Sequence, residues 1–207
     1  MMTRLIIARH GNTFAHGEEV RRVGRTDIPL VQSGLEQGYR LGIHLLQQQL
    51  LPDVLFTSTL QRTQQTAMHA QASMGTNLPL HPLSLFDEID YGIDENQPET
   101  LVRARLGEEA LRLWETQAIV PAGWQADPEQ IRTSWFYFAQ KIVTEYPQKT
   151  VLVITSNGIA RFAPYLTGDY LAFYQKHSLK LATGAYGHFE FQPTQKNWSC
   201  VSWNIRP

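Results

Sequence analysis

Three short apolar runs divide this sequence, and each is followed by a segment with helical periodicity. The runs lie in TRLIIAR (residues 3–9), PDVLFTS (52–58) and VLVITS (151–156). Short continuous apolar runs bounded by polar residues are typical of strands that are buried on both faces. Strands that alternate with helices favour a mostly parallel sheet with helices on both sides. The sequence therefore predicts an α/β fold, a three-layer α/β/α sandwich with a mostly parallel central sheet.

The length of 207 residues suits a single domain, residues 1–207. Between the second and third runs, two amphipathic segments at 98–116 and 127–146 interrupt the alternation. In the second segment, Asp127 is placed to cap the helix and Pro128 suits its first turn. We interpret residues 93–148 as a helical insert that forms a lid over the sheet. Near the C-terminus, residues 184–192 and 200–205 alternate like strands, which predicts a hairpin or a sheet edge.

The composition makes some classes of partner unfavourable. The formal net charge is −1, so no general field attracts nucleic acid or an anionic membrane. No apolar run reaches the length of a membrane span, and the first run is too short for a signal peptide. The single Cys200 excludes an internal disulfide framework. We therefore expect a cytoplasmic protein without a nucleic-acid or membrane partner.

Charged and polar residues follow the predicted strands. They are Arg9 and His10 after the first, Arg62 beyond the second, Asp87 and Glu88 after a further extended segment, and Ser156, Asn157 and Gly158 after the third. Ligands of open α/β sheets bind beyond the carboxyl ends of the strands, so these side chains should meet at one edge. Arginine binds phosphate oxygens through its planar fork, and a neutral histidine nitrogen is a nucleophile. A carboxyl group can protonate a leaving oxygen. The set suits phosphoryl transfer.

Four sequence blocks resemble the histidine phosphatase superfamily, which includes the cofactor-dependent phosphoglycerate mutases. The blocks are LIIARHGNT (5–13), GRTDIPLVQSGLEQG (24–38), DVLFTSTLQRTQQTA (53–67) and LFDEIDYG (85–92). They occur in the order of the family, with Thr59 where proline is common, and the similarity resumes at 150–162. The resemblance implies a phosphoglycerate mutase-like fold and a phosphoryl-transfer enzyme that needs no metal. We expect no cofactor.

The resemblance also implies roles for individual residues. His10 would be the nucleophile that becomes phosphohistidine, and Glu88 would be the general acid and then the base for the incoming water. The two arginines, Arg9 and Arg62, would bind the phosphoryl oxygens. Further residues would line the phosphate or substrate side of the pocket: Asn12, Thr13 and Arg25.

The third strand departs from the family pattern at its end. The family has a second histidine there, in patterns such as Ser-His-Gly-Gly before a helical arginine. Alignment on Arg161 places Ser156 at the histidine position and Asn157 at the following glycine, and we expect both to line the phosphate pocket. The loss of one donor to the transferring group costs about 2.7–4 kcal/mol, or about 10²–10³ in rate. We therefore expect reduced or altered activity, unless an imidazole such as His16 or His177 refills the pocket.

These residues favour hydrolysis of a small phosphorylated metabolite, and alternatives stay open. Ser156 favours a phosphate-binding or regulatory module that is catalytically weak. A phosphoglycerate mutase would have to keep water away from its phosphohistidine. A serine hydrolase is the least favoured, because Ile154 stands where a nucleophile elbow has its first glycine. The end strands could pair between copies, so a homo-oligomer is also an expectation.

Overall fold

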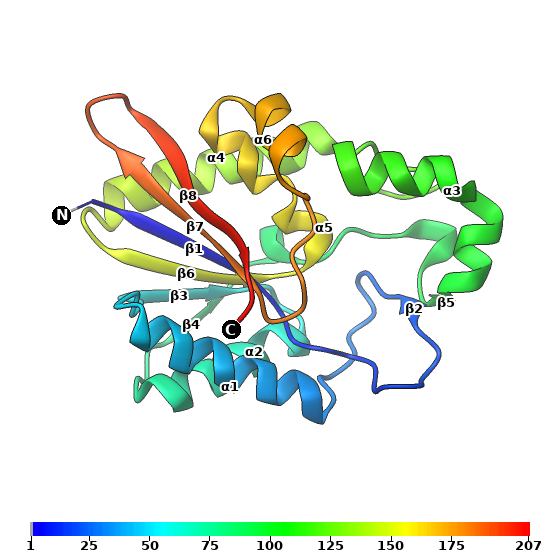
Figure 1. Cartoon of the computed structure of the whole chain (residues 1–207), viewed down its shortest axis with the longest axis horizontal. Helices are drawn as coiled ribbons and strands as arrows, with labels where there is room; N and C mark the ends of the chain where they lie inside the picture. The colour runs from blue at the N-terminus through cyan, green and yellow to red at the C-terminus, as the bar shows by residue number, and fades with distance from the viewer. Residues whose placement is uncertain (1) are drawn as a thin grey trace.

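The computed structural model describes residues 2–207 and is built around a six-stranded sheet with the order β4-β3-β6-β1-β7-β8 (Figure 1). The strands are β1 (Arg4–Arg9), β3 (Val54–Thr57), β4 (Leu80–Pro82), β6 (Thr150–Thr155), β7 (Tyr186–Gln192) and β8 (Asn197–Ile205). The first four are parallel, and β7 and β8 form an antiparallel hairpin at one edge. The predictions of a mostly parallel sheet and of a C-terminal hairpin are both confirmed.

The central strands β1 and β6 are buried on both faces. Residues 5–8 and 151–154 have no exposed surface, and the strands pair in parallel with Ile6 opposite Leu152. A strand with two covered faces needs apolar side chains at successive positions. This requirement explains why both segments read as continuous apolar runs.

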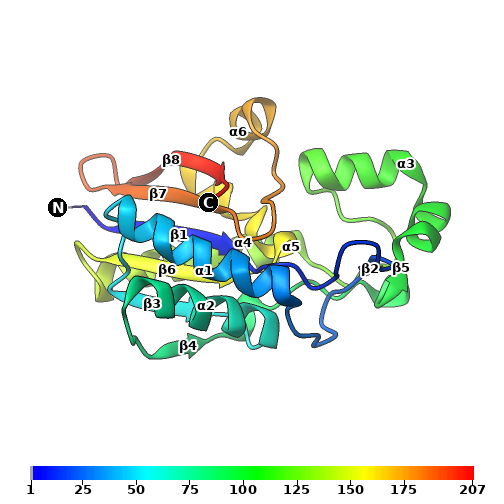
Figure 2. The same ribbon diagram turned by 60° about the horizontal axis from the view of Figure 1, so that its bottom comes forward.

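Helices cover both faces of the sheet (Figure 2). One face packs against α1 (Gln32–Gln47) and α2 (Gln61–Met74), with Leu41 and Ala67 in one apolar cluster with Ile6. The opposite layer consists of α4 (Pro128–Glu145), the one-turn α5 (Asn157–Ala160), η3 (Ala163–Thr167) and α6 (Tyr170–Lys176). The three layers are those of the predicted α/β/α sandwich.

Helix α4 corrects the predicted lid. Asp127 caps the helix as expected, because its carboxylate accepts hydrogen bonds from the backbone N–H groups of Glu129 and Gln130 at 2.9 and 3.2 Å. The apolar face of the helix, however, packs on the sheet, where the rings of Phe138 and Phe56 lie 5.0 Å apart edge to face. Helix α4 is therefore part of the helical layer, and the lid cannot extend to residue 148.

Helix α3 (Glu99–Gln117) extends beyond the sandwich, on the side where β1 and β6 end (Figure 1). The chain reaches it through η1 (Ser84–Phe86), η2 (Gly92–Asp94) and a short ladder of β2 (Arg21–Arg22) with β5 (Gln97–Pro98). The helix bends at Gly107, whose φ of 78° favours glycine. Within residues 2–207, neither α3 nor any other helix is long and apolar enough to cross a membrane.

Candidate active site

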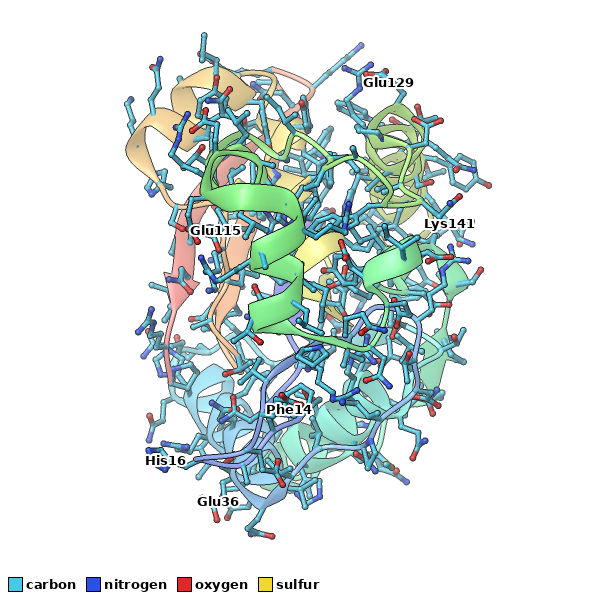
Figure 3. The ribbon with its side chains drawn as sticks, turned by 90° about the vertical axis from the view of Figure 1, so that its right-hand side faces the viewer. Phe14, His16, Glu36, Glu115, Glu129 and Lys141 are labelled. Carbon is cyan, nitrogen blue, oxygen red and sulfur yellow. The ribbon has the colours of Figure 1, made fainter. Side chains whose placement is uncertain are left out.

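A cavity of about 670 Å³ opens beyond the carboxyl ends of β1 and β6. Its wall includes seven of the nine predicted site residues: Arg9, His10, Asn12, Thr13, Arg62, Glu88 and Asn157. Figure 3 views the molecule from this side, with Phe14 and His16 on the loop after β1 and Glu115 on α3. The wall carries seven Arg or Lys side chains and three Glu side chains, which favours an anionic ligand. Across residues 2–207, no group of three or more His, Cys, Asp or Glu side chains is placed to hold a metal ion.

His10 presents a neutral ring to this cavity. Its side chain is buried, and Nδ1 lies 2.7 Å from the carbonyl oxygen of Gly11. Because a carbonyl oxygen only accepts, Nδ1 carries the proton and Nε2 keeps a free lone pair. Burial and the positive charges of Arg62 and Arg9 hold the pKa of His10 well below its ordinary value of 6.5. Nε2 is therefore suited to nucleophilic attack.

The lowered pKa of His10 should be directly measurable. We expect His10 to stay neutral when the pH falls from 7 to 5.5, because charging it means placing a cation beside two buried arginines. Below pH 6.5 the unfolded chain gains this proton and the folded chain does not, so the free energy of unfolding should decrease as the pH falls. NMR titration of the seven histidines, with His10→Ala for assignment, measures this. An ordinary titration near pH 6.5 would contradict it.

Arg62 and Arg9 hold their guanidinium groups against backbone carbonyls. Arg62, in the first turn of α2, is 1% exposed, and it donates to the carbonyls of Thr26 and Gly24 at 3.0 and 2.5 Å. Arg9 donates from Nη1 to the carbonyl of Leu181 at 2.9 Å. Burial lowers the pKa of both groups. Fixed guanidinium forks of this kind suit the oxygens of a phosphoryl group.

Glu88 is fixed at the amino end of α5. Its Oε1 accepts from the backbone N–H of Ile89 and its Oε2 from that of Gly158, each at 3.0 Å. A Cβ atom at Gly158 would lie 2.1 Å from Oε1 of Glu88. The backbone of Gly158 has an ordinary helical conformation, which any residue could adopt. The position therefore requires glycine because a larger side chain would collide with the carboxylate of Glu88.

We expect Gly158→Ala to lower kcat by about 10²-fold or more, because it displaces the carboxyl group that would act as general acid. Steady-state kinetics with a phosphate monoester measures the effect. If the effect passes through Glu88, the double variant Gly158→Ala/Glu88→Gln should be no slower than Glu88→Gln alone. If the losses of activity in the two single variants added fully in the double variant, Gly158→Ala would affect kcat independently of Glu88.

Asn12 orders the loop after β1. Its Nδ2 donates to Oγ of Ser33 at 3.2 Å, and its Oδ1 accepts from Oγ1 of Thr183 at 2.6 Å. The backbone N–H of Asn12 donates to Oε1 of Gln37 at 2.8 Å. Both ends of the amide are used within the protein, so Asn12 positions this wall. Thr13 follows it on the same wall.

The structure does not bring Arg25 and Ser156 to the cavity wall, which corrects two predictions. The side chain of Arg25 is exposed on the loop that Arg62 holds. Ser156 has no exposed surface, and its Oγ makes no hydrogen bond within residues 2–207. Of the two histidines considered as replacements, His16 lines the cavity, whereas His177 packs on Phe173 at 4.8 Å between ring centroids.

Five further Arg or Lys residues line the cavity that were not among the predicted site residues: Arg21, Arg22, Arg103, Arg161 and Lys180. The guanidinium of Arg161 lies 3.8 Å from the ring centroid of Trp114 on α3 and donates to the carbonyl of Trp114. Burial lowers the pKa of Arg161 to about 10. Arg22 forms an ion pair with Glu99 of α3, and Lys180 contributes from the loop after α6. The family pattern offered a signal for Arg161, and Lys180 has no local sequence signal.

Comparisons with known proteins point to one family. The sequence profile of the Histidine phosphatase superfamily (branch 1) matches residues 5–206. The 2,3-bisphosphoglycerate-dependent phosphoglycerate mutase of Chlamydia trachomatis serovar L2b is 26% identical over 96% of this chain and 95% of its own length. The enzyme of the same description from Bartonella quintana is 27% identical over 87% of this chain and 88% of its own length.

Solved structures share the fold at lower identity. A mycobacterial glucosyl-3-phosphoglycerate phosphatase superposes with a TM-score of 0.78 at 18% identity and covers 98% of both chains. A phosphoserine phosphatase from Entamoeba histolytica, solved in complex with 3-phosphoglyceric acid, superposes with a TM-score of 0.76 at 18% identity, over 99% of this chain and 98% of its own. With the family profile matched along nearly the whole sequence, this chain belongs to branch 1 of the histidine phosphatase superfamily.

Proposed function

We propose that this protein hydrolyses the phosphate monoester of a small metabolite through a phosphohistidine on His10. The observation that carries the proposal is the hydrogen bond from Nδ1 of His10 to Gly11, which leaves Nε2 neutral and free beside Arg9 and Arg62. The structurally similar proteins described as phosphatases of glucosyl-3-phosphoglycerate and phosphoserine support a small substrate.

In the first step, the lone pair of Nε2 attacks the phosphorus atom and forms the P–N bond, while the P–O bond to the leaving group breaks. The leaving oxygen takes the proton of the Glu88 carboxyl group. The ring keeps its Nδ1 proton, which stays bonded to the carbonyl of Gly11. The guanidinium groups of Arg9 and Arg62 stabilise the charge on the phosphoryl oxygens.

In the second step, water attacks the same phosphorus atom and its proton goes to the Glu88 carboxylate. The electrons of the P–N bond return to Nε2, and inorganic phosphate leaves. His10 is neutral again and Glu88 is protonated, so the cycle closes without a metal ion or a cofactor.

Phosphoglycerate mutase activity is the second candidate, because the relatives from Chlamydia and Bartonella carry that description over most of the chain. A mutase must protect its phosphohistidine from water. The family's second imidazole is absent from this sequence at the aligned Ser156, which favours a shorter-lived phosphohistidine and hydrolysis. The same absence leads us to propose a slower enzyme than one with both histidines. If the wild-type protein showed no turnover at all, the remaining candidate would be a phosphate-binding module.

Helix α3 supplies the outer wall of the cavity and, we propose, sets the choice of substrate. Its contributions are Glu99, Arg103, Trp114 and Glu115. This wall mixes both signs of charge with an aromatic ring, so a substrate with polar groups beyond its phosphate would find partners there.

Trapping of the phosphohistidine tests the proposed function. Wild-type protein is incubated briefly with p-nitrophenyl phosphate and quenched in alkali, where phosphohistidine persists, and the modified peptide is identified by mass spectrometry. We expect the modification on His10. In a parallel incubation with 3-phosphoglycerate and 2,3-bisphosphoglycerate, release of inorganic phosphate without 2-phosphoglycerate supports hydrolysis. Formation of 2-phosphoglycerate would establish the mutase instead.

A further inference from the structure

The side-chain amide of Asn157 has a fixed orientation. Its Oδ1 lies 3.0 Å from the backbone nitrogen of Leu181. That N–H needs an acceptor, and the oxygen is the only acceptor that an amide side chain offers. The nitrogen Nδ2 must therefore point away from Leu181.

Nδ2 of Asn157 is available to a ligand in the cavity. Within residues 2–207 it takes part in no hydrogen bond, and it is not one of the buried unpaired atoms. Asn157 is half-buried and lines the cavity together with His10 and Arg9. The carbonyl of Leu181 holds Arg9 at 2.9 Å, so a single residue positions both side chains through its backbone.

We propose that Nδ2 of Asn157 is a catalytic hydrogen-bond donor to a non-bridging oxygen of the phosphoryl group during transfer. This inference rests on the proposed function. It assigns the donor role of the family's second histidine to Asn157 and not to the aligned Ser156, whose hydroxyl is fully buried off the cavity. The amide keeps both protons while the P–N bond to His10 forms and the ester P–O bond breaks.

A neutral amide can take this donor role because the arginines supply the positive charge. Side-chain amides act as donors of this kind in acyl-transfer sites, where the fixed N–H stabilises the charge that develops on oxygen. The amide also keeps both of its N–H donors at every pH, whereas an imidazole loses one of its two when it becomes neutral.

Substitution at 157 and 156 tests the inference, with p-nitrophenyl phosphate as substrate. Asn157→Asp keeps an oxygen that accepts from the backbone N–H of Leu181, but it lacks the Nδ2 donor. This variant therefore separates the hydrogen bond to the phosphoryl group from the hydrogen bond to Leu181. We expect kcat to fall about 10²–10³-fold in Asn157→Ala and at least as far in Asn157→Asp. Ser156→Ala should stay within about threefold of the wild type, because its hydroxyl has no partner to lose.

Inhibition by orthovanadate and by inorganic phosphate supplies a second readout. Vanadate adopts the five-coordinate geometry of the transfer, so its inhibition should weaken in Asn157→Ala by about the same factor as kcat, with phosphate affected less than about tenfold. Equal weakening of both inhibitors, or a kcat of Asn157→Ala within threefold of the wild type, would overturn the donor role. A wild type that forms no phosphohistidine would overturn the proposed function itself, which is a different result.

Discussion

His10→Ala should lower kcat for p-nitrophenyl phosphate by about 10⁴–10⁶-fold, the largest effect expected in this protein, because it removes the atom that we propose bonds to phosphorus. The substitution leaves the arginines and Glu88 in place, so binding of inorganic phosphate should be retained. The measurement is steady-state kinetics together with isothermal titration of phosphate. Retained binding without turnover is the signature of a lost nucleophile in an intact pocket.

The matched control is His16→Ala, on the same wall of the cavity. His16 is exposed on the loop after β1. We expect its loss to change kcat less than about tenfold, since no contact within residues 2–207 fixes its ring toward His10 or Glu88. If His10→Ala kept wild-type turnover and His16→Ala lost it, the nucleophile would be misassigned.

The second-largest effect should come from Arg62. Arg62→Lys should lower kcat/KM by about 10³–10⁵-fold, because a point charge replaces a fork held in place by the carbonyls of Thr26 and Gly24. Arg62→Ala should lose as much activity and also stability. It leaves two carbonyl oxygens without their donor, at about 1–3 kcal/mol each where they remain buried.

Urea unfolding and kinetics of the two Arg62 variants separate these effects. Arg62→Lys can still donate to one carbonyl, so its free energy of unfolding should lie between the wild type and Arg62→Ala. Its activity should lie close to that of Arg62→Ala. Near-normal activity in the lysine variant would show that charge alone, and not the planar fork, is what the phosphoryl group requires.

Helix α3 illustrates how the cavity depends on segments far apart in the chain. Trp114 on α3 stacks on Arg161 of the layer beneath it, and Glu99 pairs with Arg22 of β2. A shift of α3 would move both arginines. The geometry of the cavity thus depends on a helix that lies outside the three layers.

The sheet, and the gathering of most predicted site residues at one edge of it, could be predicted from sequence because their signals are local. A strand buried on both faces needs an unbroken apolar run, and β1 and β6 have one each. Parallel strands end at the same edge, which places His10 and Asn157 on one wall of the cavity. The cap at Asp127 is equally local, since it involves only residues two and three positions ahead.

Tertiary contacts decided which side chain at the end of β6 faces the cavity. The alignment placed both Ser156 and Asn157 in the pocket, but the neighbours that fix this turn are distant in sequence: Glu88 binds Gly158, and Leu181 binds Asn157. The same holds for α4, whose amphipathic pattern suits a lid as well as a helical layer, and which lies on the sheet through Phe56 and Phe138. A periodic pattern specifies that a face is buried, and only the assembled chain supplies the surface that buries it.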